Sequence, residues 1–186
     1  MDAYSYLSVL LSIILGLAIT QVLQGYRALL LASGRVKISP AVLIWSVLIL
    51  LFAAQAWWAS FGLRDRTQWD FLSLAVILLQ MILLYMLAAL VFPDVGSTDP
   101  VDLIEHSDKY RHAFFGFLIA MLVTSIAKTL ILDHQLPSPT NLGFHLLLMA
   151  IAAAGMFSRN HRLHIALALA ASIGFLSYVA LLFARL

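Results

Sequence analysis

The chain of 186 residues contains no cysteine, and only 11% of its residues are charged. The absence of cysteine excludes disulfides, thiolate catalysis and thiolate metal ligands. Soluble domains are about 25% charged, so this composition, with 63% hydrophobic residues, excludes an ordinary soluble domain. The formal net charge is only +2. With no basic stripe and no stacking aromatics beside one, nucleic acid is not an expected partner.

Acidic residues and prolines are missing from the long apolar runs. None of the nine carboxylates lies inside such a run. Proton relays and cation sites usually need an intramembrane Asp or Glu, so a proton-coupled antiporter and a side-chain cation filter are not expected. Prolines that would break a helix at a midplane substrate site are also absent there. The prolines lie between the runs, at Pro40, Pro93, Pro100, Pro137 and Pro139.

What remains is a set of apolar runs of membrane-spanning length. Crossing a bilayer core of about 30 Å takes about 20 residues. The first run lacks the basic start and the small-residue exit of a cleavable signal peptide, so it is expected to be retained. We therefore predict an all-α fold, a bundle of six transmembrane helices in a lipid bilayer, forming one domain over 1–186. The expected spans are about 6–31, 41–61, 71–92, 113–132, 142–157 and 165–183.

The connections between the spans carry an uneven basic charge. With six spans, one side of the membrane holds Arg35, Lys37, Lys109, Arg111, Arg159 and Arg162, and the other holds Arg64, Arg66 and Arg185. Lysine and arginine concentrate on the cytoplasmic side of membrane proteins. Both termini are therefore expected outside. The four tryptophans suit anchors at the membrane interfaces.

The third connection predicts a helix of its own. In Asp99-Pro-Val-Asp102, a helix-capping residue, a first-turn proline and an early acid follow one another. A short helix near 100–112 is expected, running along the interface or straight into the fourth span. Its acids, Asp102 and Glu105, are expected to pair with Arg159 and Arg162 of the last connection. Two Asp/His pairs have metal-ligand spacing, but a solvated, capped helix is the stronger interpretation, and no cofactor is expected.

Four segments carry a resemblance to a known family: LSIILGLAITQVLQG, QAWWASFGLRD, LLYMLAALVFPD and YRHAFFGFL. They are similar to an uncharacterised family of small bacterial inner-membrane proteins with six predicted transmembrane helices, over most of the first four spans. The resemblance implies a bacterial inner membrane and six helices. It implies no activity.

The first span carries polar residues where lipid is expected. At about 100° per residue, Gly16, Thr20, Gln24 and Arg27 fall within one arc, and Gln21 lies at its margin. An amide or a guanidinium is costly to leave in lipid, so this arc is expected to face protein or water. By depth, Thr20 and Gln24 are expected to meet Gln80 near the midplane. Toward the outside, the residues expected to meet are Gln55, Lys128 and His145.

Two functions fit these polar residues. The first is a homo-oligomeric channel or facilitator for a small anion or neutral solute. The second is a non-transporting membrane scaffold or accessory subunit, whose polar residues only hold helices together. A continuous wet cavity favours the first and a dry core the second. No GxSxG, HExxH or Walker motif is present, so an enzyme is not predicted.

Overall fold

The computed structural model describes residues 3–32, 34–66, 68–94 and 100–182. Over these residues it forms α1 (Ala3–Leu31), α2 (Pro40–Ser60), α3 (Phe71–Val91), α4 (Leu103–Asp133), α5 (Pro139–Phe157) and α6 (His161–Leu182). All six helices are long and apolar enough to cross a membrane. The predicted all-α bundle of six helices is confirmed. A single 3₁₀ turn, η1 (Phe61–Leu63), follows α2.

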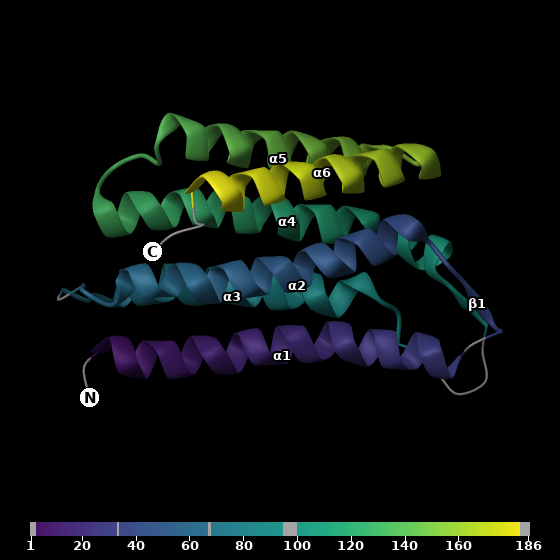
Figure 1. Ribbon diagram of the computed structural model, residues 1–186, viewed down its shortest axis with the longest axis horizontal. Helices are drawn as coiled ribbons and strands as arrows, with labels where there is room; N and C mark the ends of the chain where they lie inside the picture. The colour runs from purple at the N-terminus through teal and green to yellow at the C-terminus, as the bar shows by residue number, and fades with distance from the viewer. Residues whose placement is uncertain (1–2, 33, 67, 95–99, 183–186) are drawn as a thin grey trace.

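The helices run up and down between two ends of the bundle (Figure 1). α1 lies along one edge and packs on α2 and α3, while α5 and α6 lie along the opposite edge. α4 packs between α3 and α5, and α6 returns to contact α2. We call one end the strand end; it holds residues 34–39, 100–102 and 158–160. The other, the terminal end, holds residues 61–66 and 134–138 with the start of α1 and the end of α6.

Side chains close the helix termini at the terminal end. The Asp70 carboxylate accepts a hydrogen bond from the Ser73 backbone N–H at 2.7 Å and so caps α3. Arg66 donates through Nη2 to the Leu132 carbonyl at 2.6 Å, near the C-terminus of α4. That terminus ends in His134 with the left-handed φ of 53°. The connection between α2 and α3 therefore holds the end of α4.

At the strand end the connection before α4 differs from the prediction. Val101–Asp102 forms a two-residue strand, β2, paired in parallel with β1, Val36–Lys37. α4 begins only at Leu103 and continues without a break into the fourth span, the second of the two expected paths. The expected start at Pro100 is wrong because residues 101–102 are held in the strand pair. Asp99, the expected cap, lies outside the described residues.

Asp102 caps α4 and pairs with a lysine that the sequence analysis did not consider. Its Oδ1 accepts from the Ile104 backbone N–H at 2.8 Å, and its Oδ2 lies 2.8 Å from Lys37 Nζ. The register of the strand pair explains why Lys37 is the partner, because β1 and β2 place Lys37 directly opposite Asp102. The ion pairs among the described residues do not join Asp102 or Glu105 to the arginines of the last connection, Arg159 and Arg162, which are exposed.

α1 turns an apolar stripe toward its neighbours. The stripe follows helical spacing and consists of Leu7, Leu11, Leu15, Ala18 and Val22, each no more than 4% exposed. Gly25 continues it and lies against the Phe92 ring, where a Cβ would overlap the ring atoms. Next to it, the Tyr26 hydroxyl and Ser46 Oγ share a hydrogen bond of 2.7 Å. These contacts fix the rotation of α1 about its axis.

Gly25 and Gly16 give a matched test of this packing. We expect Gly25→Ala to destabilise the protein by about 1–3 kcal/mol, because Phe92 is buried and cannot move away without repacking. Gly16→Ala meets nothing within 4 Å. It should be neutral or stabilise the helix by up to about 1 kcal/mol. Chemical unfolding in detergent, followed by circular dichroism, measures both. Equal effects of the two substitutions would contradict the described rotation of α1.

Asp102 gives a test that depends on pH. The hydrogen bond from Lys37 is the main cause that lowers the pKa of Asp102, with further lowering by the Glu105 and Ile104 backbone N–H groups. A carboxyl with a lowered folded pKa stabilises the fold above its unfolded pKa, and this contribution disappears as pH falls through the folded pKa. Asp102→Asn keeps a capping side chain but loses the ion pair. We expect it to lower the unfolding temperature at neutral pH and to match the wild type once Asp102 is protonated.

Asp102→Ala is the control for the cap. It removes the capping oxygen as well as the charge, so it should stay less stable than Asp102→Asn at every pH. If Asp102→Asn and the wild type differ equally at neutral and acidic pH, the ion pair with Lys37 does not contribute.

Candidate functional site

A polar cavity opens at the terminal end of the bundle. Its volume is about 250 Å³, and residues of all six helices line it. A smaller cavity of about 60 Å³ adjoins it toward the bundle centre. The two share Gln55, Gln80 and Ser125 in their walls. We call the two cavities together the vestibule; its other polar lining residues are Ser60, Lys128, Thr129, Asp133, Asn141, His145 and Tyr178.

Lys128 is a cation in this vestibule without a paired acid. It lies on α4, about a turn before the helix ends at Asp133. Asp133 is the nearest candidate partner, but its Oδ1 lies 3.6 Å from Arg66 Nη1. The ion pairs found among the described residues do not include Lys128. The vestibule therefore contains a positive charge that a ligand can approach.

Two acceptor oxygens of the vestibule lack partners. Gln80 Oε1 and Asn141 Oδ1 are buried and accept no hydrogen bond. A buried polar atom without a partner costs free energy, so both oxygens favour an occupant that donates to them. The vestibule thus offers a donor at Lys128 and acceptors at Gln80 and Asn141.

His145 is held in one orientation in the vestibule wall. Its Nδ1 lies 2.9 Å from the Asn141 carbonyl oxygen, and its Nε2 lies 3.0 Å from Ser125 Oγ. A carbonyl oxygen only accepts, so Nδ1 carries the proton of the neutral ring and Nε2 accepts from the Ser125 hydroxyl. His145 therefore joins α5 to α4 and leaves no ring nitrogen free for a ligand.

The structure brings together part of the polar set that the sequence analysis singled out. Gln55, Lys128 and His145, expected to meet toward the outside, line this one vestibule. Gln80 also lines the vestibule. Its predicted contact with Thr20 and Gln24, which rested on depth alone, is not formed. Thr129 and Asn141 were missed, although both lie one helical turn or less from a polar residue already considered.

The arc on α1 does not face the interior of the single chain. Thr20, Gln24 and Arg27 are exposed on the outer face of α1. The marginal residue, Gln21, turns inward instead and donates through Nε2 to the Tyr85 hydroxyl at 3.2 Å. Thr20 needs no interior partner because its hydroxyl donates to the Gly16 carbonyl of its own helix at 2.8 Å. Arg27 lies one turn before the end of α1, so its long side chain can reach the interface.

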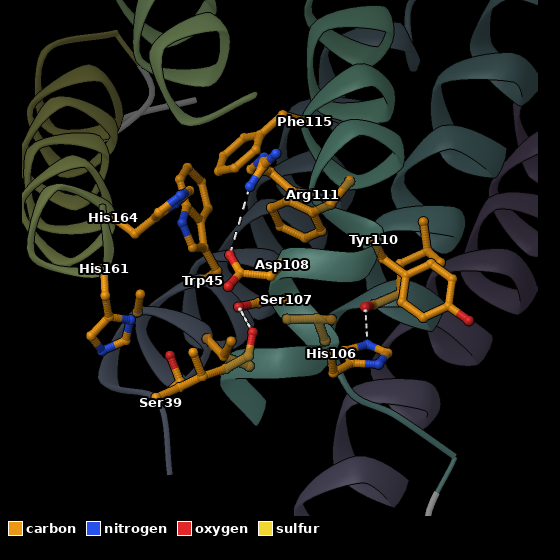
Figure 2. Close-up of a pocket in the computed structure, with 16 residues that line it drawn as sticks. Ser39, Trp45, His106, Ser107, Asp108, Tyr110, Arg111, Phe115, His161 and His164 are labelled. Atoms are coloured by element: carbon orange, nitrogen blue, oxygen red, sulfur yellow. Dashed lines mark hydrogen bonds and ion pairs between the residues drawn. The ribbon is translucent and has the colours of Figure 1, made fainter. Parts of the chain in front are cut away.

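A second polar pocket lies at the strand end, where the sequence analysis predicted only solvated charges and an interfacial tryptophan. Figure 2 shows its side chains, among them Trp45 of α2, Arg111 of α4 and His164 of α6. Arg111 was expected in a connection, but α4 begins earlier and buries it to 6% exposure. Its Nε donates to the Met156 carbonyl oxygen at 2.9 Å. Arg111 and Trp45 are therefore internal groups of the bundle.

An apolar layer separates the vestibule from the strand-end pocket. On each helix that contributes to it, the layer lies between the residues that line the vestibule and those that line the strand-end pocket. Its members are 0–1% exposed: Leu48, Leu87, Leu118, Ala168 and Ala171. Among the described residues, the vestibule and the strand-end pocket are thus separate compartments and do not form one continuous channel.

No family model, curated protein or solved structure matches this chain. The family resemblance, the bacterial inner membrane and the orientation of the termini therefore stay predictions. Within the described ranges, His, Asp and Glu side chains nowhere gather in a group able to hold a metal ion. Function must be argued from the two polar compartments.

Proposed function

We propose that the protein is a homo-oligomeric channel or facilitator for a small polar solute, which it binds in the vestibule. The observation that carries this proposal is the unpaired Lys128 ammonium beside two buried acceptors without partners, Gln80 Oε1 and Asn141 Oδ1. Ionisable residues inside membrane spans are costly to insert and usually serve transport or binding.

The vestibule chemistry narrows the class of solute. Lys128 attracts an anionic or strongly accepting group, and the two amide oxygens require hydrogen-bond donors. A bare halide satisfies only the lysine. A small hydroxylated anion or a small polyol satisfies both, and the volume of about 250 Å³ restricts the solute to a small molecule.

The apolar layer serves as the gate in this proposal. Solute in the vestibule meets side chains that leave no room for water, including Leu48, Leu87 and Leu118. Apolar constrictions close membrane pores by excluding water. Passage then requires the helices around this layer to separate, and the structure corresponds to a closed state open toward the terminal end.

The outward polar face of α1 supports the homo-oligomeric part of the proposal. Gln24 lies on the outer face of the single chain, where lipid cannot satisfy its amide. On the same face, Ser12, Gly16 and Thr20 are exposed at four-residue spacing, which lets a second helix approach closely. A second copy of α1 supplies hydrogen-bond partners that lipid lacks.

Solute flux into liposomes tests the vestibule. Stopped-flow swelling with glycerol, and glycolate uptake with valinomycin to balance charge, serve as the neutral and anionic probes. We expect Lys128→Gln to slow glycolate flux about tenfold or more, the effect of losing a hydrogen bond to a charged group. Arg27→Gln removes a cation outside the vestibule and should leave the glycolate rate within about twofold.

The alternative hypothesis is a non-transporting membrane scaffold, and the apolar layer is the observation that favours it. Under that hypothesis neither probe crosses the bilayer faster than through empty liposomes. Correctly folded protein without flux of either probe, or an equal loss in Lys128→Gln and Arg27→Gln, contradicts the proposed transport through the vestibule.

Engineered cysteines test the α1 seam, since the chain has no native cysteine. We expect Thr20→Cys to form a disulfide-linked dimer in the bilayer under mild oxidation. Ile173→Cys is the control, because residue 173 on α6 is 68% exposed and lies at a similar depth from the strand end. Equal crosslinking of the two variants indicates random collision and contradicts an α1 seam.

A further inference from the structure

The strand-end pocket contains three buried polar groups without partners. They are Ser39 Oγ, Trp45 Nε1 and Arg111 Nη1. The three residues are 1%, 4% and 6% exposed, and all of them line the pocket. Native proteins seldom leave such groups unpaired, because each loses its hydrogen bonds to water. Three at one pocket indicate that an occupant completes it.

The donors determine what this occupant is. The Trp45 indole and the Arg111 guanidinium have hydrogens to give and no lone pair to offer. The Ser39 hydroxyl can also donate. An occupant that satisfies all three must therefore present several acceptor atoms, as a carboxylate or a phosphate group does.

The nearby acid does not supply that acceptor. Asp108 Oδ1 lies 3.7 Å from Arg111 Nη1, which is beyond hydrogen-bond distance, and the Asp108 side chain is 50% exposed (Figure 2). Arg111 Nε is already used by the Met156 carbonyl at 2.9 Å. The Nη1 group is consequently buried and charged, in an ion pair with Asp108 but without a hydrogen-bond partner.

Apart from the Asp108 carboxylate, which also lines the pocket, the surroundings favour negative charge as well. His161 and His164 line it from the first turn of α6, and Ser39 from the N-cap of α2. Both helix N-termini place a partial positive charge at this end. His164 Nε2 lies 3.0 Å from the Ser158 carbonyl, so that nitrogen carries a proton, and its ring stacks on Phe115.

The Trp45 ring is fixed in place by its neighbours. Its centroid lies 5.7 Å from that of Phe114 and 5.6 Å from that of Phe115, both edge to face. This packing determines where the indole N–H lies before any ligand arrives. The cavity of about 50 Å³ exceeds the roughly 10–15 Å³ that one water needs, and it admits a small charged group and no larger molecule.

From these contacts we propose that the strand-end pocket is an oxyanion-binding site, with Trp45 Nε1 and Arg111 Nη1 as its donors. The group bound is a carboxylate or phosphate, carried either by a soluble molecule or by the headgroup of a lipid at this end of the bundle. This site is separate from the vestibule, and its occupancy does not depend on the proposed transport.

Indole N–H signals in ¹⁵N NMR spectra test the site directly. The protein is held in a maltoside detergent without phosphate, inorganic phosphate is added at constant ionic strength, and Trp45→Phe assigns the Trp45 signal. We expect a saturable downfield shift of the Trp45 indole proton as it donates to the anion. The Trp57 signal, from a residue 46% exposed near the terminal end, should not move.

Substitutions then measure the contribution of the donor. Trp45→Phe keeps an aromatic ring against Phe114 and Phe115 but removes the N–H, so it should fold and bind phosphate about tenfold more weakly. Trp57→Phe is the matched control and should bind like the wild type. Arg111→Gln should abolish phosphate binding. If this variant fails to fold, the phosphate affinity of Trp45→Phe still tests the proposed site.

A second titration, with a lipid, distinguishes the two sources of the anion. Phosphatidylglycerol added to the same micelles replaces inorganic phosphate. A Trp45 shift with phosphate supports a soluble oxyanion, and a shift with the lipid alone supports a headgroup. If neither additive shifts the Trp45 signal saturably, or if Trp45→Phe binds phosphate as tightly as the wild type, the pocket holds only water and the proposal is overturned.

Discussion

Hydrocarbon provides no hydrogen bonds, and this single constraint orders the bundle. Hydroxyl side chains can form a hydrogen bond within their own helix. Thr20, Thr124 and Ser172 each donate to the carbonyl one turn earlier, at 2.8 Å. Such residues can lie on any face of a helix. Amides and cations have no such local solution, and the His145 imidazole has one for Nδ1 only, so the positions of these groups carry the information about packing and binding.

The sequence predicts the helices well for that reason. Backbone groups are satisfied only in helices or closed barrels, so apolar runs of sufficient length fix the number and approximate limits of the spans. The depth of a residue along a span could also be estimated from the sequence, and Gln55, Lys128 and His145, expected at one level, line the same vestibule. Depth does not give rotation about the helix axis. Gln80 was consequently assigned to the wrong neighbours, because the arc on α1 faces away from the interior of the single chain.

Errors at the strand end have a different cause. The two residue pairs that join β1 to β2 are too short to leave a pattern, yet they delay the start of α4 to Leu103. They also bring Lys37 to Asp102, although the whole of α2 and α3 lies between these two residues in the sequence. Arg111 becomes internal because the helix extends beyond the apolar run. Whether a charged residue near the end of a span is buried or exposed therefore cannot be predicted until the contacts of the connection are known.

α5 joins the two polar compartments. Near its start, the Asn141 carbonyl holds His145, and Asn141 Oδ1 faces the vestibule without a partner. Near its end, the Met156 carbonyl holds Arg111. Gly155 is the residue that permits this closeness: a Cβ there would lie 2.5 Å from the Phe115 ring. Phe115 in turn contacts the Trp45 and His164 rings. Helices move largely as rigid bodies, so a displacement of α5 along its axis must alter Lys128's surroundings and Arg111's together, across a layer that admits no water.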